Sequence, residues 1–206
     1  MAIRSERMSM IIGLTGGIAT GKSTVSKMFK SVGIPVIDTD LITHSLYNKQ
    51  SEVYDELVET FGQRIVLENK DINRQVLGQM IYNDRERRCT LNRIVHPNVK
   101  RIALDEIEKY KQLNHKVIVV DVPLLFETDF NELVDITLVV YIGPDLQHQR
   151  LMDRDGINES FAWSKINSQM PLKEKRDLAD YVIDNSHSIS DTRKQFNNLL
   201  EKLGVL

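Results

Sequence analysis

Short apolar runs alternate with helical patterns at both ends of the chain. Residues 10–15 are apolar and precede a glycine-rich stretch, after which Val25, Met28 and Phe29 recur at helical spacing up to Gly33. Because glycine accepts the left-handed conformation that often closes a helix, we expect Gly33 to end this one. The other patterns predict strands at 34–37, 117–120, 134–142 and 181–183, and helices at 145–154, 160–169 and 190–203.

A long helical segment interrupts this alternation. Between Leu41 and about Asn114, apolar residues recur at helical spacing and no strand is predicted. The sequence shows no internal repeat and no Ser/Gly linker, which favours an insertion into one α/β sheet over a separately linked domain. We expect a mainly parallel sheet with right-handed crossovers, because its strands are continuous apolar runs.

Glycines and acidic residues follow the predicted strands at their carboxyl ends. A glycine-rich loop begins after Thr15, Asp38 and Asp40 follow the second apolar run, and Asp121 follows the third. Ligands of parallel sheets bind beyond the carboxyl ends of the strands. We therefore expect these features to share one edge of the sheet.

Composition and charge exclude several classes of function. The chain of 206 residues is 41% hydrophobic and 27% charged, which indicates a globular protein rather than a disordered one. Its net charge of −2 provides no positive field for a nucleic acid, so we expect no nucleic-acid partner. Cys89 is the single cysteine, and the histidines lack the spacing of zinc ligands, which is typical of a protein from a reducing cytosol.

The opening of the chain is left out of the predicted fold. Met1, Met8 and Met10 are alternative starts, so residues 1–9 are either an upstream start or a remnant of cloning. This segment lacks the apolar centre of a signal peptide, and no apolar run approaches the roughly 18 residues of a membrane span. We expect a cytoplasmic protein without a membrane partner.

One loop indicates the class of ligand. Residues 16–23 have the sequence Gly-Gly-Ile-Ala-Thr-Gly-Lys-Ser, which matches the phosphate-binding pattern G-x-x-x-x-G-K-[ST] between a predicted strand and a predicted helix. Gly16 and Gly21 can adopt backbone angles denied to other residues, which allows consecutive N–H groups to face phosphate oxygens beside the positive helix end. A tight turn with an incidental lysine would not account for Lys22 and Ser23 together.

The residues of this loop have expected partners on ATP. Lys22 supplies a positive charge to the β and γ phosphates, and Ser23 places a hydroxyl where Mg²⁺ bridging those phosphates can use it. Thr24 adds a donor to the α phosphate. The residues expected to bind ATP here are Gly17, Ala19, Thr20, Gly21, Lys22, Ser23 and Thr24, with Mg²⁺ as the cofactor.

Phosphoryl transfer to a small molecule is the function that the loop favours. A guanine-nucleotide switch would need an N-K-x-D sequence, and Glu-Asn-Lys-Asp at 68–71 is out of frame with no strand leading into it. A motor ATPase normally needs a larger core and a basic channel. Two other hypotheses stay open: a kinase for a nucleoside, nucleotide or shikimate-like alcohol, and a regulator that binds nucleotide without transferring phosphate.

Further segments occur in order along nearly the whole chain after Met10. They are Gly-Leu-Thr-Gly-Gly-Ile at 13–18, Val-Ile-Asp-Thr-Asp at 36–40, His-Pro at 96–97, Asp-Val-Pro-Leu-Leu-Phe-Glu at 121–127, Gln-Arg-Leu at 149–151 with Arg-Asp at 154–155, and Ala-Asp-Tyr-Val-Ile-Asp-Asn at 179–185. In this order they resemble the dephospho-coenzyme A kinase family. That family phosphorylates the ribose 3′-hydroxyl of dephospho-CoA with ATP, the last step of coenzyme A biosynthesis.

The resemblance implies an α/β fold: a three-layer P-loop kinase-like core with a mainly parallel sheet, a helical acceptor-binding insert and a helical lid. The nucleotide-binding core corresponds to 10–42, 115–144 and 171–206, the acceptor domain to 43–114 and the lid to 145–170. ATP and dephospho-CoA are the implied partners, and no obligate protein partner is inferred.

Two positions depart from the family pattern. Ala19 and Thr20 replace the Gly-Ser pair that the family often has, and we expect little effect because the backbone donors remain. Lys165 stands where the lid usually carries arginine, which puts a bidentate phosphate contact at that position in doubt.

Asp38 and Asp40 are the candidate acid–base residues. If the chain is extended there, both carboxylates point the same way, so one can accept the proton of the acceptor hydroxyl while the other orients it or holds Mg²⁺ through water. Alternatively, one of them caps a helix that starts at Leu41. The resemblance assigns the base to Asp40 and leaves Asp38 as a cap or support.

Asp121 stands where a Walker B acid would hold Mg²⁺ through water, or it serves the turn that follows. Glu127 is a weaker candidate of the same kind.

Basic and polar residues supply the remaining candidates. Arg150 and Arg154 share a helix face that either meets the triphosphate, with Arg150 catalytic, or is solvated and paired with Asp153 and Asp155. Each of the other candidates has an alternative structural role, in a solvated face, at a helix boundary or in a turn. They are Arg74, Arg85, Arg87 and Arg88 for the acceptor pyrophosphate, His96 for acceptor positioning, and Asp184 and Asn185 for the adenine of ATP.

Overall fold

The computed structural model describes residues 9–82 and 84–205. Residues 1–8 of the opening segment lie outside the described residues, whereas the hydroxyl of Ser9 donates a hydrogen bond of 2.7 Å to the carbonyl oxygen of His115. The chain divides into two compact units. One contains the residues up to Ile37 together with those from Ile107 onward, and the other contains Asp38–Glu106.

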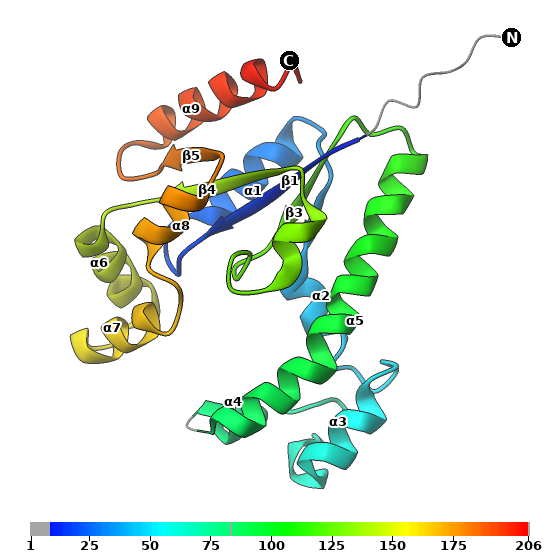
Figure 1. Cartoon of the computed structure of the whole chain (residues 1–206). Helices are drawn as coiled ribbons and strands as arrows, with labels where there is room; N and C mark the ends of the chain where they lie inside the picture. The colour runs from blue at the N-terminus through cyan, green and yellow to red at the C-terminus, as the bar shows by residue number, and fades with distance from the viewer. Residues whose placement is uncertain (1–8, 83, 206) are drawn as a thin grey trace, which may run out of the picture. The chain divides into compact units, whose positions relative to one another are not determined.

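Five strands form one sheet in the order β2-β3-β1-β4-β5 (Figure 1). The central strand β1 pairs in parallel with β3 and with β4, and β4 pairs in parallel with β5. Parallel neighbours need crossover connections, and helices provide them here. The strands are β1 (Met10–Gly16), β2 (Val36–Asp38), β3 (Val117–Asp121), β4 (Ile136–Tyr141) and β5 (Tyr181–Asp184).

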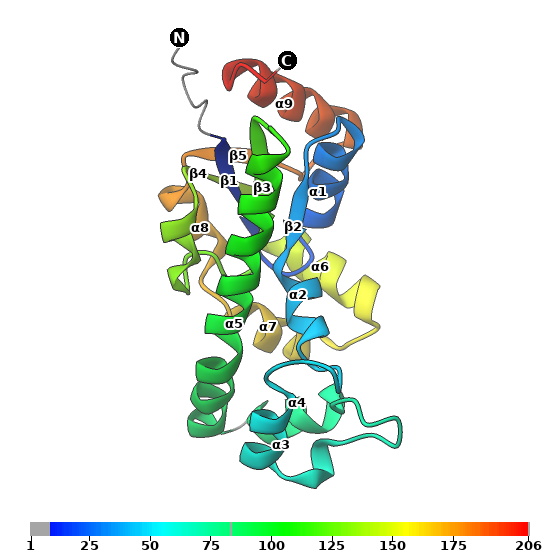
Figure 2. The same cartoon turned by 90° about the vertical axis from the view of Figure 1, so that its right-hand side faces the viewer.

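Helices cover both faces of this sheet. On one face α1 and α9 pack together (Figures 1 and 2). The rings of Phe29 and Phe196 meet edge to face there, with their centroids 4.8 Å apart. On the other face α8 packs against β4, where Leu172 and Val139 belong to one buried apolar cluster. The helices of this first unit are α1 (Lys22–Ser31), α6 (Pro144–Asp155), α7 (Glu159–Asn167), α8 (Leu172–Leu178) and α9 (Ile189–Lys202), with a 3-10 turn at Asp129–Leu133.

Alternation along the strands explains the two layers of core. Leu138 and Val140 belong to the cluster beneath α1 and α9, whereas Val139 between them belongs to the cluster beneath α8. Successive side chains of a strand point to opposite faces, so a strand buried on both sides must be apolar throughout. The predicted three-layer α/β core with a mainly parallel sheet is confirmed.

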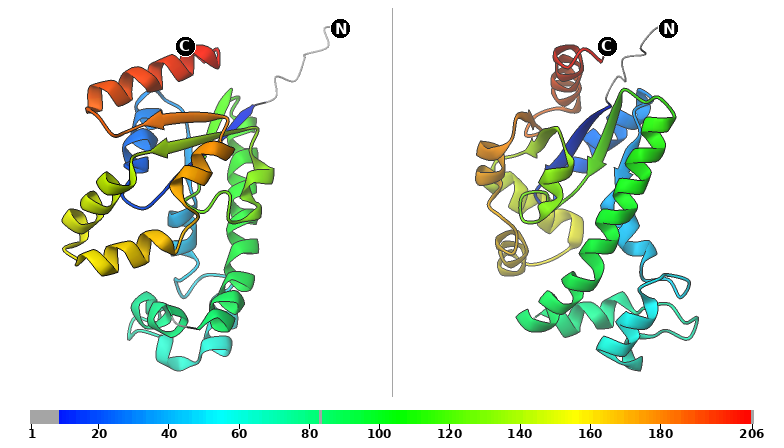
Figure 3. Two further views of the ribbon diagram at one scale, coloured as in Figure 1. Left: turned by 60° about the vertical axis from the view of Figure 1, so that its left-hand side comes forward. Right: turned by 45° about the vertical axis from the view of Figure 1, so that its right-hand side comes forward.

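The helices α6 and α7 pack against each other as a pair (Figure 3). The imidazole of His148 lies on the indole of Trp163, with ring centroids 4.5 Å apart and planes 16° apart. Gly156 ends α6 in the left-handed conformation, φ 63°, and Asn158 caps α7 by accepting a hydrogen bond from the N–H of Phe161. This pair occupies most of the segment predicted as a lid.

The second unit is helical, as the spacing of its apolar residues predicts. Its helices are α2 (Thr39–Ser45), α3 (Tyr54–Phe61), α4 (Arg74–Tyr82) and the larger part of α5 (Arg85–Gln112), with a 3-10 turn at Gln63–Ile65. An isolated antiparallel bridge joins Val66 to Ile72. Across the described ranges 9–82 and 84–205, no helix combines the length and the apolar character that a membrane crossing requires.

Helix α5 continues through Pro97, so the helix boundary proposed at His96 is wrong. Proline removes one backbone donor, but the apolar face that includes Ile94 and Val99 is buried on both sides of it. The side-chain amide of Asn98 donates a hydrogen bond of 2.8 Å to the carbonyl oxygen of Ile94. Burial of this face outweighs the local cost of the proline.

Candidate active site

The phosphate-binding loop runs from the end of β1 to the start of α1. Ala19 and Gly21 have left-handed backbone conformations, with φ 61° and 87°. Gly16 does not have a positive φ; a Cβ there would lie 2.7 Å from Oγ1 of Thr20 and 2.9 Å from the carbonyl oxygen of Val140. The expectation that Gly16 supplies a special backbone angle is therefore wrong, because space is what this position requires.

The start of α1 favours an anion. Its N-cap residue Gly21 has no side chain that could occupy the first N–H groups, and no acidic residue lies in the first turn. No carboxylate from the first turn of α1 therefore offsets its N–H groups or the positive end of its dipole. Ser23 is exposed at this end, whereas the N–H of Thr24 donates to the carbonyl oxygen of Gly21 at 2.9 Å. The contact of Thr24 with the α phosphate stays a prediction.

Lys22 forms a hydrogen-bonded ion pair with Asp121, the last residue of β3. The Asp121 side chain is only 3% exposed and that of Lys22 is 18% exposed. A carboxylate buried to this degree needs a charged or hydrogen-bonding partner, and the ammonium group provides one. The pair fixes a positive charge beside the N-terminus of α1.

The residues present suit Mg²⁺, although the described residues contain no group of three or more His, Cys, Asp or Glu side chains that could hold a metal ion by themselves. Mg²⁺ prefers oxygen ligands and commonly combines one or two protein oxygens with phosphate oxygens and water. The Ser23 hydroxyl and the Asp121 carboxylate are donors of that kind.

Asn185 supports the loop from the end of β5. Its side-chain amide donates to the carbonyl oxygen of Thr20 at 2.8 Å and accepts from the hydroxyl of Thr192 at 2.8 Å. A Cβ on Gly21 would lie 2.1 Å from the Asn185 nitrogen, so this contact requires glycine at position 21. Asn185 is buried, with 7% of its surface exposed. Its predicted contact with adenine stays a prediction.

Arg150 and Arg154 lie one turn apart on α6 but have different partners. Arg150 donates to the backbone carbonyl of Asn185 at 3.1 Å, next to the loop. Arg154 is exposed and pairs with Asp155 at 2.8 Å, and Lys165 pairs with the same carboxylate at 2.8 Å. Hydrogen bonds from Arg154 and Lys165 lower the pKa of Asp155 to about 2. The arrangement at Arg154 is that of the solvated, paired alternative, and its contact with ATP stays a prediction.

Asp38 caps the helix that contains Asp40. Its Oδ1 accepts hydrogen bonds from the N–H groups of Asp40 at 3.0 Å and Leu41 at 3.1 Å. The helix α2 begins at Thr39, so the extended arrangement considered for the two acids is wrong. The capping role predicted for Asp38 is confirmed, although the helix begins at Thr39, two residues before the expected start at Leu41. Asp40 is exposed in the first turn of α2, and its role as a base stays a prediction.

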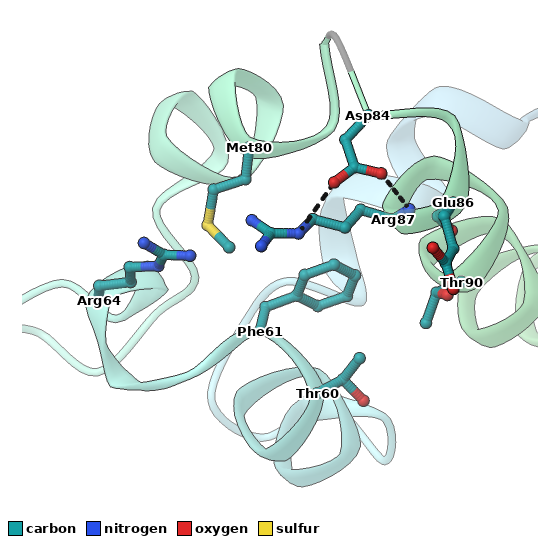
Figure 4. A pocket seen from close by; sticks show the side chains of 8 residues that line it. All are labelled: Thr60, Phe61, Arg64, Met80, Asp84, Glu86, Arg87 and Thr90. Carbon is teal, nitrogen blue, oxygen red and sulfur yellow. Dashed lines mark hydrogen bonds and ion pairs between the residues drawn. The ribbon is translucent and has the colours of Figure 1, made fainter.

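The second unit contains a pocket of about 400 Å³. Figure 4 shows Arg64 and Arg87 pointing toward one another from opposite sides, with Met80 and Phe61 between the elements that carry them. Arg87 also pairs with Asp84 at 3.1 Å. The pocket therefore combines two guanidinium groups with apolar surface, although its acidic residues offset part of the charge. Its lining residues are Thr60, Phe61, Arg64, Met80, Asp84, Glu86, Arg87 and Thr90.

The other acceptor candidates lie elsewhere in the second unit. Arg74 is exposed at the start of α4, near Tyr47. Burial raises the pKa of the Tyr47 hydroxyl, and the charge of Arg74 opposes this shift. His96 is half-buried within α5. Neither Arg74 nor His96 lines the pocket described above.

The sequence matches the family model for dephospho-CoA kinase over residues 10–191. The chain belongs to the dephospho-CoA kinase family. A dephospho-CoA kinase from Oceanobacillus iheyensis is 44% identical over 198 residues, which are 96% of this chain and 100% of the relative. A solved structure of a dephospho-CoA kinase from Campylobacter jejuni has a TM-score of 0.73 and 26% identity, covering 95% of this chain and 98% of that one. A Thermus thermophilus crystal structure has a TM-score of 0.81 and 30% identity over the same shares of the two chains.

Membership of the dephospho-CoA kinase family confirms the predicted class of enzyme. It also confirms ATP-dependent phosphorylation of dephospho-CoA, in coenzyme A biosynthesis, as the predicted function. The family assignment does not test the individual residue roles or the three functional segments, and these are taken up below as proposals.

Lys175 was not among the candidates for this kinase site, yet its charged side chain is fully buried beneath the loop. Its ammonium group is 0% exposed, pairs with Glu127 at 2.7 Å and donates to the carbonyl oxygen of Pro123 at 2.9 Å. Burial lowers the pKa of Lys175, the Glu127 carboxylate opposes this, and the nearby Lys22 lowers it further. Glu127 thus neutralises a buried cation, which is a structural role different from the metal role considered for it.

Proposed function

We propose that this kinase transfers the γ-phosphoryl group of ATP to the ribose 3′-hydroxyl of dephospho-CoA. The observation that supports binding of the phosphoryl donor ATP is the ion pair of Lys22 with Asp121. It lies at the N-terminus of α1, which no side chain caps. In this proposal residues 10–42, 115–144 and 171–206 bind ATP, residues 43–114 bind the acceptor and residues 145–170 form the lid. We place the reaction in the cytoplasm, where ATP is made and used.

The reaction forms a bond between the acceptor oxygen and the γ phosphorus, and it breaks the bond between that phosphorus and the oxygen bridging to the β phosphate. Asp40 takes the proton of the attacking hydroxyl. Lys22 and the N–H groups of the loop stabilise the charge that spreads over the transferred group and the leaving ADP. Arg150 supplies a further positive charge from α6.

Bound Mg²⁺ would neutralise phosphate charge and orient the β and γ phosphates. Ser23 would hold it through its hydroxyl and Asp121 through water. The remaining donor contacts proposed are those of Gly17, Ala19, Thr20, Gly21 and Thr24 to the phosphates, Arg154 to the triphosphate and Asn185 to the adenine.

The acceptor carries a diphosphate, which calls for cations in the unit that binds it. Arg74 and His96 are proposed contacts, and the pocket described above adds Arg64 and Arg87. A guanidinium group binds phosphate with two parallel hydrogen bonds, and two facing guanidinium groups can hold both phosphates of a diphosphate. Phe61 and Met80 supply apolar surface for the adjoining parts of the acceptor.

Acceptor-dependent release of ADP tests the function directly. With Mg²⁺ and ATP, dephospho-CoA is expected to release ADP and to gain the mass of one phosphoryl group, whereas nucleosides, nucleotides and shikimate are not. Nuclear magnetic resonance of the product should place the new phosphate on the 3′ oxygen. Turnover of a different alcohol only would refute the acceptor, and ATP binding without any turnover would support the regulator instead.

Replacing Arg87 with methionine tests the acceptor pocket. Because the variant loses a charged hydrogen-bond donor but keeps an apolar stem, the KM for dephospho-CoA is expected to rise by about tenfold or more. The KM for ATP should stay within about twofold, because the change lies in the acceptor unit.

Arg93→Met is the matched control, because Arg93 is exposed on the same helix and does not line the pocket. It should leave both KM values unchanged. A similar rise of the dephospho-CoA KM in the two variants would show a general charge effect, and no rise in Arg87→Met would remove the pocket from the acceptor site.

A further inference from the structure

We propose that Gln147 and Gln169 are positioning residues that hold the first turn of the phosphate-binding loop in its working conformation. They lie at the two ends of the segment proposed as the lid, Gln147 in the first part of α6 and Gln169 after α7. Both bind the backbone of Ile18, the third residue of the loop. The inference rests on the proposed function only in taking this loop as the ATP site.

The two glutamines bind opposite groups of Ile18. The amide nitrogen of Gln147 donates to the Ile18 carbonyl oxygen at 2.9 Å. The amide oxygen of Gln169 accepts from the Ile18 N–H at 3.0 Å. Since one contact needs an N–H donor and the other an oxygen acceptor, the two side chains have different chemical requirements.

Burial and close packing make the Gln147 contact specific. Gln147 is only 3% exposed, so its amide must find partners inside the protein. A Cβ on Gly17 would lie 2.5 Å from its amide nitrogen, which places the glutamine in the space that a side chain at position 17 would fill. The glycine at position 17 and the glutamine at position 147 therefore depend on each other.

The neighbouring backbone explains why the loop needs this support. Ala19 follows Ile18 with φ 61°, a left-handed conformation that is unfavourable for a residue with a Cβ atom. A strained residue keeps its conformation only when surrounding contacts fix it. With both polar groups of Ile18 bound by the glutamines, the chain enters Ala19 in one orientation, and the N–H groups that follow are directed to the phosphates.

The end of the lid segment is itself anchored to the core. The N–H of Met170, next to Gln169, donates to Glu127 at 3.1 Å, and Glu127 pairs with the buried Lys175. Lys175 in turn contacts the carbonyl oxygen of Pro123, which also accepts from the hydroxyl of Thr15 at the end of β1. Gln169 therefore reaches the loop from a fixed point and can act as a rigid support.

Methionine variants test whether the contacts position the loop for ATP. Gln147→Met and Gln169→Met keep the length of the side chain and remove the hydrogen bond. Each is expected to weaken the binding of a non-hydrolysable ATP analogue by about five- to tenfold in titration calorimetry, while kcat at saturating ATP falls less than about threefold. Gln112→Met, an exposed change at the end of α5, should leave the affinity unchanged. Unchanged affinity in both loop variants would overturn the proposal.

Glutamate variants test the opposite polarity of the two contacts, in protein without nucleotide. A carboxylate still accepts a hydrogen bond, so Gln169→Glu should keep the Ile18 amide protected from hydrogen exchange, whereas Gln169→Met should speed its exchange about tenfold. Gln147→Glu loses its donor and faces a carbonyl oxygen, so it should speed exchange across 17–19. Equal effects of the two glutamate variants would contradict the assigned contacts. Neither the calorimetric titration nor the hydrogen-exchange measurement involves dephospho-CoA, so an error in the acceptor would leave these two results intact.

Discussion

Replacing Lys22 with methionine is expected to lower kcat/KM for ATP by about a thousandfold. The methionine side chain fills the volume of the lysine stem but brings no charge to the β and γ phosphates. In phosphoryl transfer the protein contributes mainly positioning and electrostatic stabilisation, so the loss should be largest in kcat. Steady-state rates of ADP release at varied ATP, with dephospho-CoA saturating, measure it.

The ion pair with Asp121 complicates this variant and also supplies its control. Without the ammonium group, a carboxylate that is only 3% exposed loses a charged partner, and the variant is expected to be less stable. Lys22→Met combined with Asp121→Asn should recover thermal stability but not activity. That result would show that unfolding does not cause the loss of activity.

Lys27→Met provides the matched control on the same helix, because Lys27 is exposed on α1 beyond the loop. It should retain the full rate. A rate within tenfold of the original in Lys22→Met would remove Lys22 from the catalytic group.

Local patterns were sufficient for most of the fold. The apolar runs predicted the five strands, and the glycines at 33 and 156 end their helices with φ 79° and 63°, as expected of residues that accept the left-handed conformation. The sequence patterns do not predict helix α8, which begins directly after Pro171. Proline also suits the start of a helix, where its missing N–H has no partner to lose, and here Pro171 is the N-cap of α8.

The parts of the site that are close together in the sequence could be predicted, whereas those that meet across long sequence separations could not. The phosphate-binding loop is recognisable because its glycines, Lys22 and Ser23 lie within eight consecutive residues and one turn performs the function. Its supports are not recognisable, because Gln147, Gln169 and Lys175 meet the loop across sequence separations of 129, 151 and 159 residues. No spacing rule applies to such contacts, and a glutamine or lysine within a helix is usually solvated.

Asp38 at the end of β2 and Asp40 in the first turn of α2 show how the same substitution at two nearby positions can identify the base. Asp38 accepts the N–H groups of Asp40 and Leu41, and asparagine caps a helix about as well as aspartate. Asp38→Asn should therefore leave kcat within about threefold. Asp40→Asn keeps the shape of the side chain but cannot take the proton of the acceptor hydroxyl, and it should lower kcat by about a hundredfold to ten-thousandfold.

The KM for ATP should change little in Asp40→Asn, since the carboxylate acts on the acceptor rather than on the donor. Rates with saturating dephospho-CoA, and ATP affinity from titration calorimetry, distinguish loss of the base from loss of binding. In the reverse pattern, activity is lost in Asp38→Asn and kept in Asp40→Asn. That result would assign the role of the base to Asp38 and require its side chain to leave the cap during the reaction. Equal losses in both would instead indicate that α2 as a whole positions the acceptor, because the cap and the first turn form one hydrogen-bonded unit.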